Sequence, residues 1–175
     1  FHDFEIVIVN DESKDHSEDI IKNFVQKNPQ IHVCYIHQKN KGLGGARNAA
    51  MRAARGTYLS LLDQDDIWYP DKLKQVLRTF KQCPDVFFVT HHLNRRIQGQ
   101  IRDELSCCFM TKNVFHQLLF GDNHFCGSAM SFRRDILDRI GYFSEDRIKI
   151  YLCEDYDYWL RAAARGFRFF VIEEA

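Results

Sequence analysis

Three carboxylates within four residues follow a hydrophobic run, and this is the part of the chain best suited to chemistry. Asp63, Asp65 and Asp66 come directly after residues 57–62, which predict a buried strand. Open α/β sheets bind ligands at the carboxyl ends of their strands. Crowded carboxylates repel one another unless a cation neutralises them. A divalent metal held by one or two carboxylates commonly also binds a phosphate. The pattern therefore indicates a metal–phosphate site.

The alternative for this segment is a solvated acidic turn. Pro70 is a favoured first helical residue, and Asp66 or Tyr69 could simply lead into a helix that starts there. That interpretation accounts for the second half of the segment. It leaves Asp63 and Asp65 at the strand end unexplained, so we favour the ligand site.

A second acidic cluster lies far along the chain from the first. Glu154, Asp155 and Asp157 begin a predicted helix, where the helix dipole favours negative charge, so a purely structural role would explain the charge pattern alone. The preceding residues 147–152 have no clear pattern and predict a loop. The separation of the two clusters allows one acid to hold a metal and another to act as a base.

Glycines, basic residues and a helix start occur together in residues 39–48. Backbone N–H groups at a helix N-terminus can bind a phosphate. The segment matches neither the Walker pattern nor the dinucleotide-binding glycine pattern, and a flexible turn before a helix is the alternative. Contact of Lys41 or Arg47 with a diphosphate therefore stays open.

Composition restricts the classes of function. The 175 residues are 45% hydrophobic and 27% charged, with 24 basic and 24 acidic residues, which is typical of one soluble domain. The charges form no basic stripe interleaved with aromatic residues, so nucleic acid is not an expected partner. No apolar run approaches the roughly 20 residues that span a bilayer. The six cysteines are irregularly spaced and predict free thiols rather than zinc ligands.

Strand-like and helix-like segments alternate along the chain. A helix is expected at 17–27, with Ser17 as its cap and with Ile20, Ile21, Phe24 and Val25 on its apolar face. Further helices are expected at 46–54, 70–82, 111–120, 134–140 and 154–165. Strands are expected at 4–9, 31–36, 57–62, 86–90, 128–132 and 169–172, and a polar hairpin or loop at 94–103. This rhythm predicts an α/β fold with a mostly parallel central sheet and helices on both faces. We expect one domain over residues 1–175.

Four segments in this order resemble the family 2 glycosyltransferases, which have the GT-A (nucleotide-diphospho-sugar transferase) fold. Residues 4–13 resemble a strand ending in Asp-Asp-Gly-Ser, and residues 40–48 resemble a glycine-containing loop before Ala-Arg-Asn. Residues 63–73 resemble the D-x-D motif with its helix, and residues 154–161 resemble the Glu-Asp motif. Asn10 stands where the family has its first Asp, and Glu12 where it has Gly.

The resemblance implies a donor site built on a divalent metal, Mn²⁺ or Mg²⁺. Asp11 matches the acid that contacts the nucleobase, and Arg47 a basic residue that helps to hold the nucleotide. Asp63 and Asp65 match the pair that serves the ribose and the metal, with Asp65 as the direct ligand. Residues 126–128 match a segment that lines the acceptor and diphosphate region.

The resemblance also implies the reaction. Asp155 matches the catalytic base, with Glu154 beside it, so an acceptor hydroxyl would lose its proton to Asp155 as it attacks the anomeric carbon. The family is inverting and uses a nucleotide-diphosphate sugar donor. The sequence contains no Q-x-x-R-W segment, so transfer of one sugar, rather than processive synthesis, is expected.

The expected acceptor is a glycan or a lipid-linked molecule, in the assembly of cell-surface polysaccharide. A cytoplasmic location is implied, with any membrane association coming from regions outside this chain. Because family members begin with a strand and a helix before the segment seen here at Phe4, we expect a catalytic domain truncated at the N-terminus and also at the C-terminus. The alternatives are a non-catalytic binding or scaffold domain of this fold and a metal-dependent phosphoesterase.

Overall fold

The computed structural model describes residues 3–97, 100–105, 113–121, 123, 125–146, 148–150 and 152–172. The chain forms two compact units, one of Phe1–Thr57 with Tyr142–Asp157 and the other of Tyr58–Gly141 with Tyr158–Ala175. The expectation that residues 1–175 form a single catalytic domain stays a prediction.

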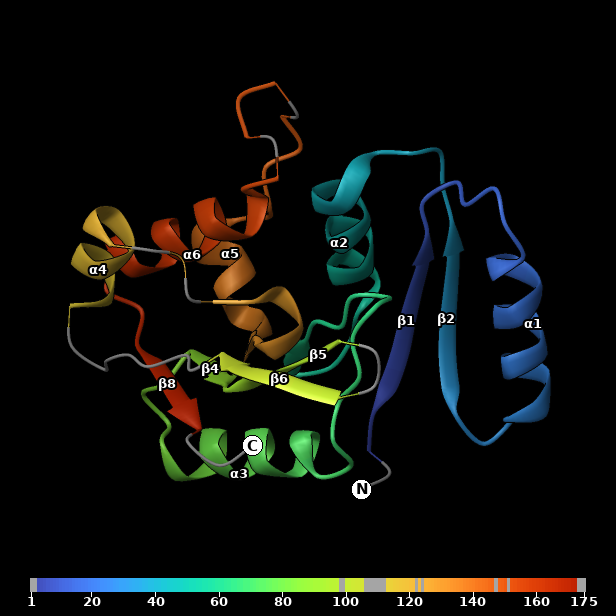
Figure 1. The fold of residues 1–175 in the computed structure, drawn as a ribbon, viewed down its shortest axis with the longest axis horizontal. Helices are drawn as coiled ribbons and strands as arrows, with labels where there is room; N and C mark the ends of the chain where they lie inside the picture. Colours follow the sequence, from blue (N-terminus) through green and yellow to red (C-terminus); the bar gives the residue numbers. More distant parts are fainter. Residues whose placement is uncertain are drawn as a thin grey trace. The chain divides into compact units, whose positions relative to one another are not determined.

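The first unit is built on a pair of parallel strands. β1 (Glu5–Asn10) pairs with β2 (His32–His37), and α1 (Ser17–Lys27) connects them. α2 (Gly42–Ala53) follows β2, and Figure 1 shows α1 and α2 on opposite sides of the strand pair. The register runs from Glu5 opposite His32 to Asn10 opposite His37, so the two strands end together. The loops that follow them therefore lie at the same edge.

The sequence predicted these elements closely, with three local differences. Ser17 is the first residue of α1 rather than its cap, and its N–H donates to Asp15 Oδ1 at 3.0 Å. Ile20, expected on the apolar face of α1, is 66% exposed. The glycines from Gly42 to Gly45, expected as a loop before a helix, form the first turn of α2, where Gly44 and Gly45 are buried.

The second unit contains a four-stranded sheet in the order β3-β7-β4-β8. β7 (Ser131–Arg133) runs antiparallel to both β3 (Tyr58–Ser60) and β4 (Phe88–His91), whereas β8 (Phe169–Ile172) is parallel to β4. Three of its four strands therefore point the same way, and β7 is the exception. The carboxyl ends of β3 and β4 lie at the same edge of the sheet as the start of β7.

Both faces of this sheet are covered by helices, because neighbouring residues of β4 point to opposite faces. Val89 packs in a buried cluster with Val76 and Phe80 of α3 (Lys72–Gln82). Phe88 packs on the other face, with its ring centroid 5.8 Å from that of Trp159 in α6 (Glu154–Ala164). Figure 1 shows α3 and α6 on opposite sides of the sheet. The expected covering of both faces is confirmed for this sheet.

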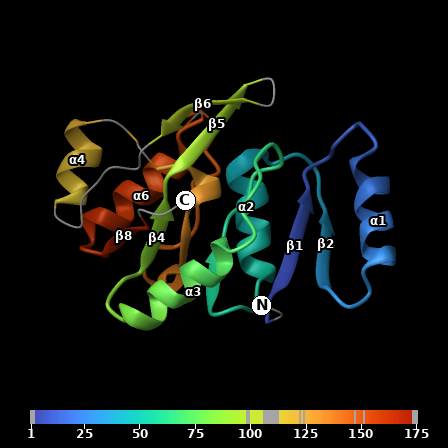
Figure 2. The same ribbon diagram turned by 60° about the horizontal axis from the view of Figure 1, so that its bottom comes forward.

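The remaining elements complete the second unit. β5 (Leu93–Ile97) and β6 (Gln100–Leu105) form an antiparallel hairpin, seen in Figure 2 beyond the end of β4, where the sequence predicted a polar hairpin or loop. α4 (Val114–Phe120), η1 (Gly127–Ala129), η2 (Arg134–Ile136) and α5 (Leu137–Ile140) follow along the chain. Gly141 ends α5 with a φ of 76°, a conformation that glycine adopts without steric cost. The expected start of α4 at residue 111 lies outside the described residues.

Three further predictions can be compared with the structure. α3 begins at Lys72 rather than Pro70, and Asp71, not Asp66 or Tyr69, stands at its N-cap. Among the described cysteines, Cys34, Cys83, Cys126 and Cys153 are free thiols, as expected, whereas residues 107 and 108 lie outside the described part. No helix in the described ranges has the length and apolar composition needed to cross a membrane.

Candidate active site

In the first unit, the Asp11 carboxylate binds the start of α2. Asp11 Oδ1 accepts the Lys41 N–H at 2.9 Å, and Oδ2 accepts the Gly42 N–H at 2.8 Å. The side-chain amide of Gln38 also donates to Oδ1, at 2.7 Å. A carboxylate is well placed here because the first N–H groups of a helix lack partners within the helix. These N–H groups are already hydrogen-bonded, which argues against a diphosphate site at this helix start.

Asn10 organises the loop that carries Asp11. It is only 4% exposed; its side-chain amide donates to the Tyr35 hydroxyl at 3.1 Å, and its side-chain oxygen accepts the Ser13 N–H at 2.8 Å. The backbone carbonyl of Asn10 accepts the Gln38 N–H at 3.0 Å. Asparagine can donate and accept at once, which an aspartate at this position could not do.

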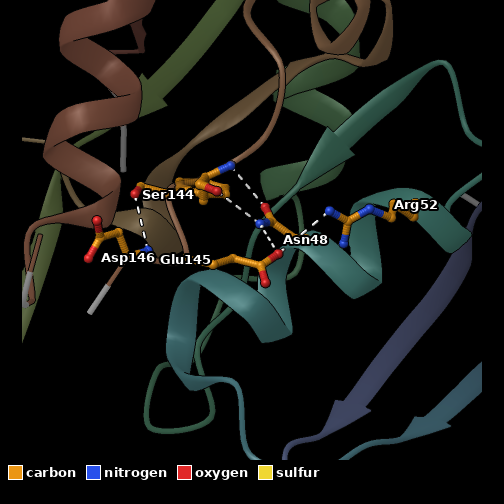
Figure 3. Close-up of polar contacts among 6 residues, drawn as sticks. Asn48, Arg52, Ser144, Glu145 and Asp146 are labelled. Atoms are coloured by element: carbon orange, nitrogen blue, oxygen red, sulfur yellow. Dashed lines mark hydrogen bonds and ion pairs between the residues drawn. The ribbon is translucent and has the colours of Figure 1, made fainter. Parts of the chain in front are cut away.

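Gly44 and Asn48 lie one turn apart on α2 and hold a distant segment against the helix. The Asn48 amide group donates to the Phe143 carbonyl at 2.9 Å, and its oxygen accepts the Phe143 N–H at 2.9 Å. Asn48 also donates to Glu145 Oε1 at 2.8 Å, and Arg52 pairs with the same oxygen at 3.5 Å (Figure 3). A Cβ on Gly44 would lie 2.5 Å from the Ser144 carbonyl oxygen, so only glycine permits this approach.

The same face of α2 brings three of the expected site residues together. Arg47 is 7% exposed, with its guanidinium carbon 5.5 Å from the centroid of the Phe143 ring, and Glu154 is likewise 7% exposed. The Cβ of Glu154 would lie 3.7 Å from a Cβ on Gly44. Arg47 is also near enough to Asp155 for its charge to act on that carboxyl group.

Asp155 is half-buried, and burial raises its pKa above the usual 3.8. The Tyr156 N–H, which donates to Asp155 Oδ1 at 2.6 Å, and the charge of Arg47 both lower the pKa, while Glu154 raises it. The net shift is upward. A carboxylate with a raised pKa is a stronger proton acceptor, provided that it is ionised at the working pH.

In the second unit, Asp63 and Asp65 follow β3 as the sequence predicts. The Asp63 N–H donates to Ser128 Oγ at 2.8 Å, and the Asp63 carbonyl accepts the Asp66 N–H at 3.2 Å, which closes a turn. Asp65 is exposed and makes no hydrogen bond or ion pair within the described part of the chain. Asp66 therefore takes part in the turn, whereas the Asp65 carboxylate is accessible to a ligand.

The chemistry of these two acids suits a magnesium or manganese ion. Both ions prefer oxygen ligands, and magnesium is commonly held by one or two carboxylates with water and substrate phosphates completing its coordination. No group of three or more His, Cys, Asp or Glu side chains in the described residues could hold a metal ion by itself. Asp63 and Asp65 therefore fit a metal that arrives together with a diphosphate, rather than a metal held by protein alone.

Ser128 is the centre of a buried polar cluster beside Asp63. Its backbone carbonyl accepts hydrogen bonds from Lys72 Nζ at 2.7 Å and from Trp68 Nε1 at 2.8 Å. The Lys72 ammonium also lies 4.3 Å from the centroid of the Trp68 ring. Burial lowers the pKa of Lys72 to about 7, and nearby Asp66 opposes that shift. Burial has the opposite effect on the neighbouring Cys126 thiol, whose pKa it raises, because burial disfavours the charged form of each group.

Sequence reasoning missed two of the residues that shape these groups. Asn48 was part of a recognised motif but had no assigned role, since its partner Phe143 is remote in sequence. Lys72 had a usable signal: it shares the buried face of α3 with Val76, Thr79 and Phe80, at helical spacing. A lysine that shares the buried face of a helix in this way indicates a buried amine with a specific partner.

Comparison with known proteins identifies a family and relatives that match large parts of the chain. A family model described as "Glycosyl transferase family 2" matches residues 1–141. An uncharacterized glycosyltransferase, alr2836 of Nostoc sp., is 36% identical over 154 residues, which cover 84% of this chain and 46% of the relative. The putative teichuronic acid biosynthesis glycosyltransferase TuaG of Bacillus subtilis is 40% identical over 87 residues, covering 50% of this chain and 34% of TuaG.

Solved structures show the same fold. S. aureus TarS (residues 1–349) superimposes with a TM-score of 0.76 at 20% identity, covering 98% of this chain and 49% of TarS. The mannosyltransferase PcManGT from Pyrobaculum calidifontis, solved in complex with GDP-Man and Mn²⁺, has a TM-score of 0.70 at 20% identity, covering 97% of this chain and 46% of PcManGT. The expected GT-A fold is confirmed. The chain spans about half the length of these proteins.

Replacing Asn48 should destabilise the first unit. Asn48→Ala leaves the buried N–H and C=O groups of Phe143 without the Asn48 side chain, at about 1–3 kcal/mol for each unsatisfied group. We expect the free energy of unfolding in urea to fall by roughly 2–4 kcal/mol. Asn28→Ala is the matched control, because its side chain donates to the Phe24 carbonyl at an exposed position. Equal small losses for the two variants would contradict the role assigned to Asn48.

Lys72 should make stability depend on pH. With a folded pKa of about 7 and an ordinary value of 10.5, the unfolded chain binds more protons between these values. The free energy of unfolding therefore gains a contribution as pH rises from 7 towards 10, by up to about 1.4 kcal/mol per pH unit. Lys72→Met should lack this contribution, whereas Lys74→Met, on the exposed side of α3, should keep it. Urea unfolding from pH 7 to 9.5 measures the difference, and identical slopes would refute the shift.

Proposed function

Because the chain belongs to glycosyl transferase family 2, we propose that it is an inverting, metal-dependent transferase that moves one sugar from a nucleotide-diphosphate donor to an acceptor hydroxyl. The observation that carries the proposal is Asp155, a half-buried carboxylate with a raised pKa beside Arg47. Such a group suits a general base, because deprotonation of an alcohol needs a proton acceptor whose pKa lies closer to the working pH.

Asp155 has the central role in this proposal. Its carboxylate takes the proton of the acceptor hydroxyl while that oxygen forms a bond to the anomeric carbon. The bond between the anomeric carbon and the diphosphate oxygen breaks in the same step, so the configuration at that carbon inverts. Arg47 and Glu154 act on Asp155 through charge, in opposite directions, and thereby set its basicity.

Asp63 and Asp65 form the donor side of the proposal. Asp65 is the direct ligand of a divalent ion, and Asp63 binds either the ion or the ribose. A bound Mn²⁺ or Mg²⁺ ion supplies positive charge that stabilises the diphosphate as it leaves. The Mn²⁺ and GDP-Man named for PcManGT support this assignment.

Asp11 and Arg47 are proposed nucleotide-binding residues. The Asp11 carboxylate is held rigidly by Lys41, Gly42 and Gln38, so any contact with a nucleobase would be made by a pre-positioned group. Arg47 is buried against Phe143 and retains its positive charge, which can act on both Asp155 and a nearby diphosphate. Both residues also have a clear structural role.

The acceptor is proposed to be a glycan or a lipid-linked molecule in the synthesis of cell-surface polysaccharide. The name of the relative TuaG, a putative teichuronic acid biosynthesis glycosyltransferase, supports this class. The cytoplasmic location implied by the family resemblance belongs to the same proposal.

A donor screen of the full-length protein with UDP-, GDP- and dTDP-sugars and manganese would test the proposed sugar transfer. Chelator-sensitive sugar transfer supports the proposal, and binding without transfer would favour a scaffold.

Two substitutions should separate the base from the metal ligand. Asp155→Asn removes the proton acceptor, so kcat should fall by about 10²–10⁴-fold while affinity for the metal–nucleotide complex stays nearly unchanged. Asp65→Asn weakens a metal ligand, so affinity for the nucleotide in the presence of Mn²⁺ should itself fall. Transfer assays and calorimetry on the full-length protein measure the two effects.

The matched control for these variants is Asp138→Asn, an exposed acid outside the proposed site. It should leave both the rate and the affinity unchanged. Equal loss of nucleotide affinity in the Asp155 and Asp65 variants would refute the division of roles.

The pH dependence of kcat/KM should report Asp155. The base must be ionised, so kcat/KM falls as pH drops through its pKa, and this acidic limb should lie above the ordinary 3.8. Arg47→Gln removes a charge that lowers this pKa, so the limb should move to higher pH. Arg47→Lys keeps the charge and should leave the limb nearer its original position.

Arg52→Gln is the control for the Arg47 variants, because Arg52 is on the same helix but pairs with Glu145. Its acidic limb should stay where it is in the unchanged protein. A limb that moves equally in the Arg52 and Arg47 variants would contradict a direct effect of Arg47 on Asp155.

A further inference from the structure

His91 is the last residue of β4, and its ring has a defined hydrogen-bonding state. Its Nδ1 atom lies 2.7 Å from the backbone carbonyl oxygen of His92. A carbonyl oxygen only accepts hydrogen bonds, so Nδ1 carries a proton and donates it. With Nδ1 protonated, the other ring nitrogen, Nε2, carries a proton if the ring is charged and none if the ring is neutral.

The surroundings of His91 favour a neutral ring. Burial lowers its pKa below the usual 6.5, and the charges of Lys72 and His92 lower it further, against the hydrogen bond to the His92 carbonyl. In a neutral imidazole with its proton on Nδ1, Nε2 is an unprotonated acceptor. His91 therefore presents a lone pair, and not an N–H group, at Nε2.

The Nε2 atom of His91 is buried, and no described residue hydrogen-bonds to it. A buried acceptor without a donor is destabilising, and buried polar atoms nearly always have a partner, whether protein, water or ligand. An anion cannot be that partner, because it would bring another lone pair. A hydrogen-bonding partner for this lone pair must therefore supply an N–H or O–H group.

The position of His91 in the sheet connects it with the expected donor site. β3 and β4 point the same way because both are antiparallel to β7. His91 at the end of β4 and Asp63 beyond the end of β3 are therefore at the same edge. Lys72 connects the two residues further. Its ammonium group donates to the Ser128 carbonyl, and Ser128 Oγ accepts the Asp63 N–H. The charge of Lys72 also acts on His91.

We propose that His91 is a sugar-binding residue whose Nε2 accepts a hydrogen bond from a sugar hydroxyl at this edge of the sheet. The inference rests on the proposed function, because a glycosyltransferase brings hydroxyl groups to this edge on both the donor sugar and the acceptor sugar. Either sugar has the required chemistry, and the experiment distinguishes them.

Two conservative substitutions separate the two ring nitrogens. Asn resembles the Nδ1 side of the ring, so His91→Asn keeps a donor for the His92 carbonyl and removes Nε2. Gln places an amide oxygen near the position of Nε2, so His91→Gln keeps an acceptor there. His116→Asn, on the exposed side of α4, is the matched control.

The test uses the full-length protein with Mn²⁺ and measures the binding of UDP, GDP, UDP-GlcNAc and GDP-mannose by calorimetry, together with the KM of the acceptor in transfer. Loss of one hydroxyl contact should weaken binding about 10-fold. In His91→Asn, weaker binding of the nucleotide sugar with unchanged binding of the nucleotide assigns the hydroxyl to the donor. Unchanged donor binding with a raised acceptor KM assigns it to the acceptor.

His91→Gln should retain most of the affected affinity, and His116→Asn all of it. Equal losses in His91→Asn and His91→Gln would show a structural role and overturn the proposal, as would unchanged constants in His91→Asn. Absence of sugar transfer by the unchanged protein would refute the proposed function by itself.

If the unchanged protein transfers no sugar, the role of His91 is tested by the ¹⁵N chemical shift of its Nε2 atom in the histidine-labelled protein. The His91 signal is identified because it is absent from His91→Gln. The shift should show an unprotonated nitrogen and should change when UDP-GlcNAc or GDP-mannose is added but not with UDP or GDP. A protonated Nε2 would overturn the inference, and an unprotonated Nε2 whose shift changes with neither sugar nucleotide would exclude the donor sugar as its partner.

Discussion

The paired hydrogen bonds between the Asn48 side chain and the Phe143 backbone are the constraint on which the first unit depends. They join two segments that are remote in sequence, and they are buried, so no water can replace them without cost. Gly44 makes the approach possible, because any side chain there would meet the Ser144 carbonyl. The backbone at Phe143 and Ser144 is therefore held against α2 by one side-chain amide and by the absence of a side chain at position 44.

The second unit uses a comparable arrangement around Ser128. Its hydroxyl accepts the Asp63 N–H, while its carbonyl accepts Lys72 and Trp68, so the strand end and the start of α3 are attached to the same short turn. The acidic turn is consequently held through the backbone N–H of Asp63, and the Asp65 side chain keeps its exposure. Rigid backbone with an accessible carboxylate is the arrangement that a metal–diphosphate ligand needs, because ordering the protein then costs little on binding.

Local patterns predicted most of the secondary structure. α1 and β8 have the bounds that the sequence indicated, and the other helices and strands are shifted by a few residues at their ends. The clearest error concerned residues 42–45: glycine has a poor helix propensity, so a loop was the natural prediction. Tertiary contacts outweigh propensity there, since Asp11 binds the first N–H groups of α2 and Ser144 requires glycine at position 44.

By itself, the sequence determined the alternation of strands and helices, the family and the identity of the acids at the ends of β3 and at the start of α6. Hydrophobic period and short motifs are local properties, and they can be read without coordinates. Only the tertiary structure decided which of these residues interact: Arg47 with Asp155 through its charge, and Asn48 with Phe143 and Lys72 with Ser128 through hydrogen bonds. Burial and charge at these contacts set proton affinities, and burial is a property of the folded chain that no local pattern contains.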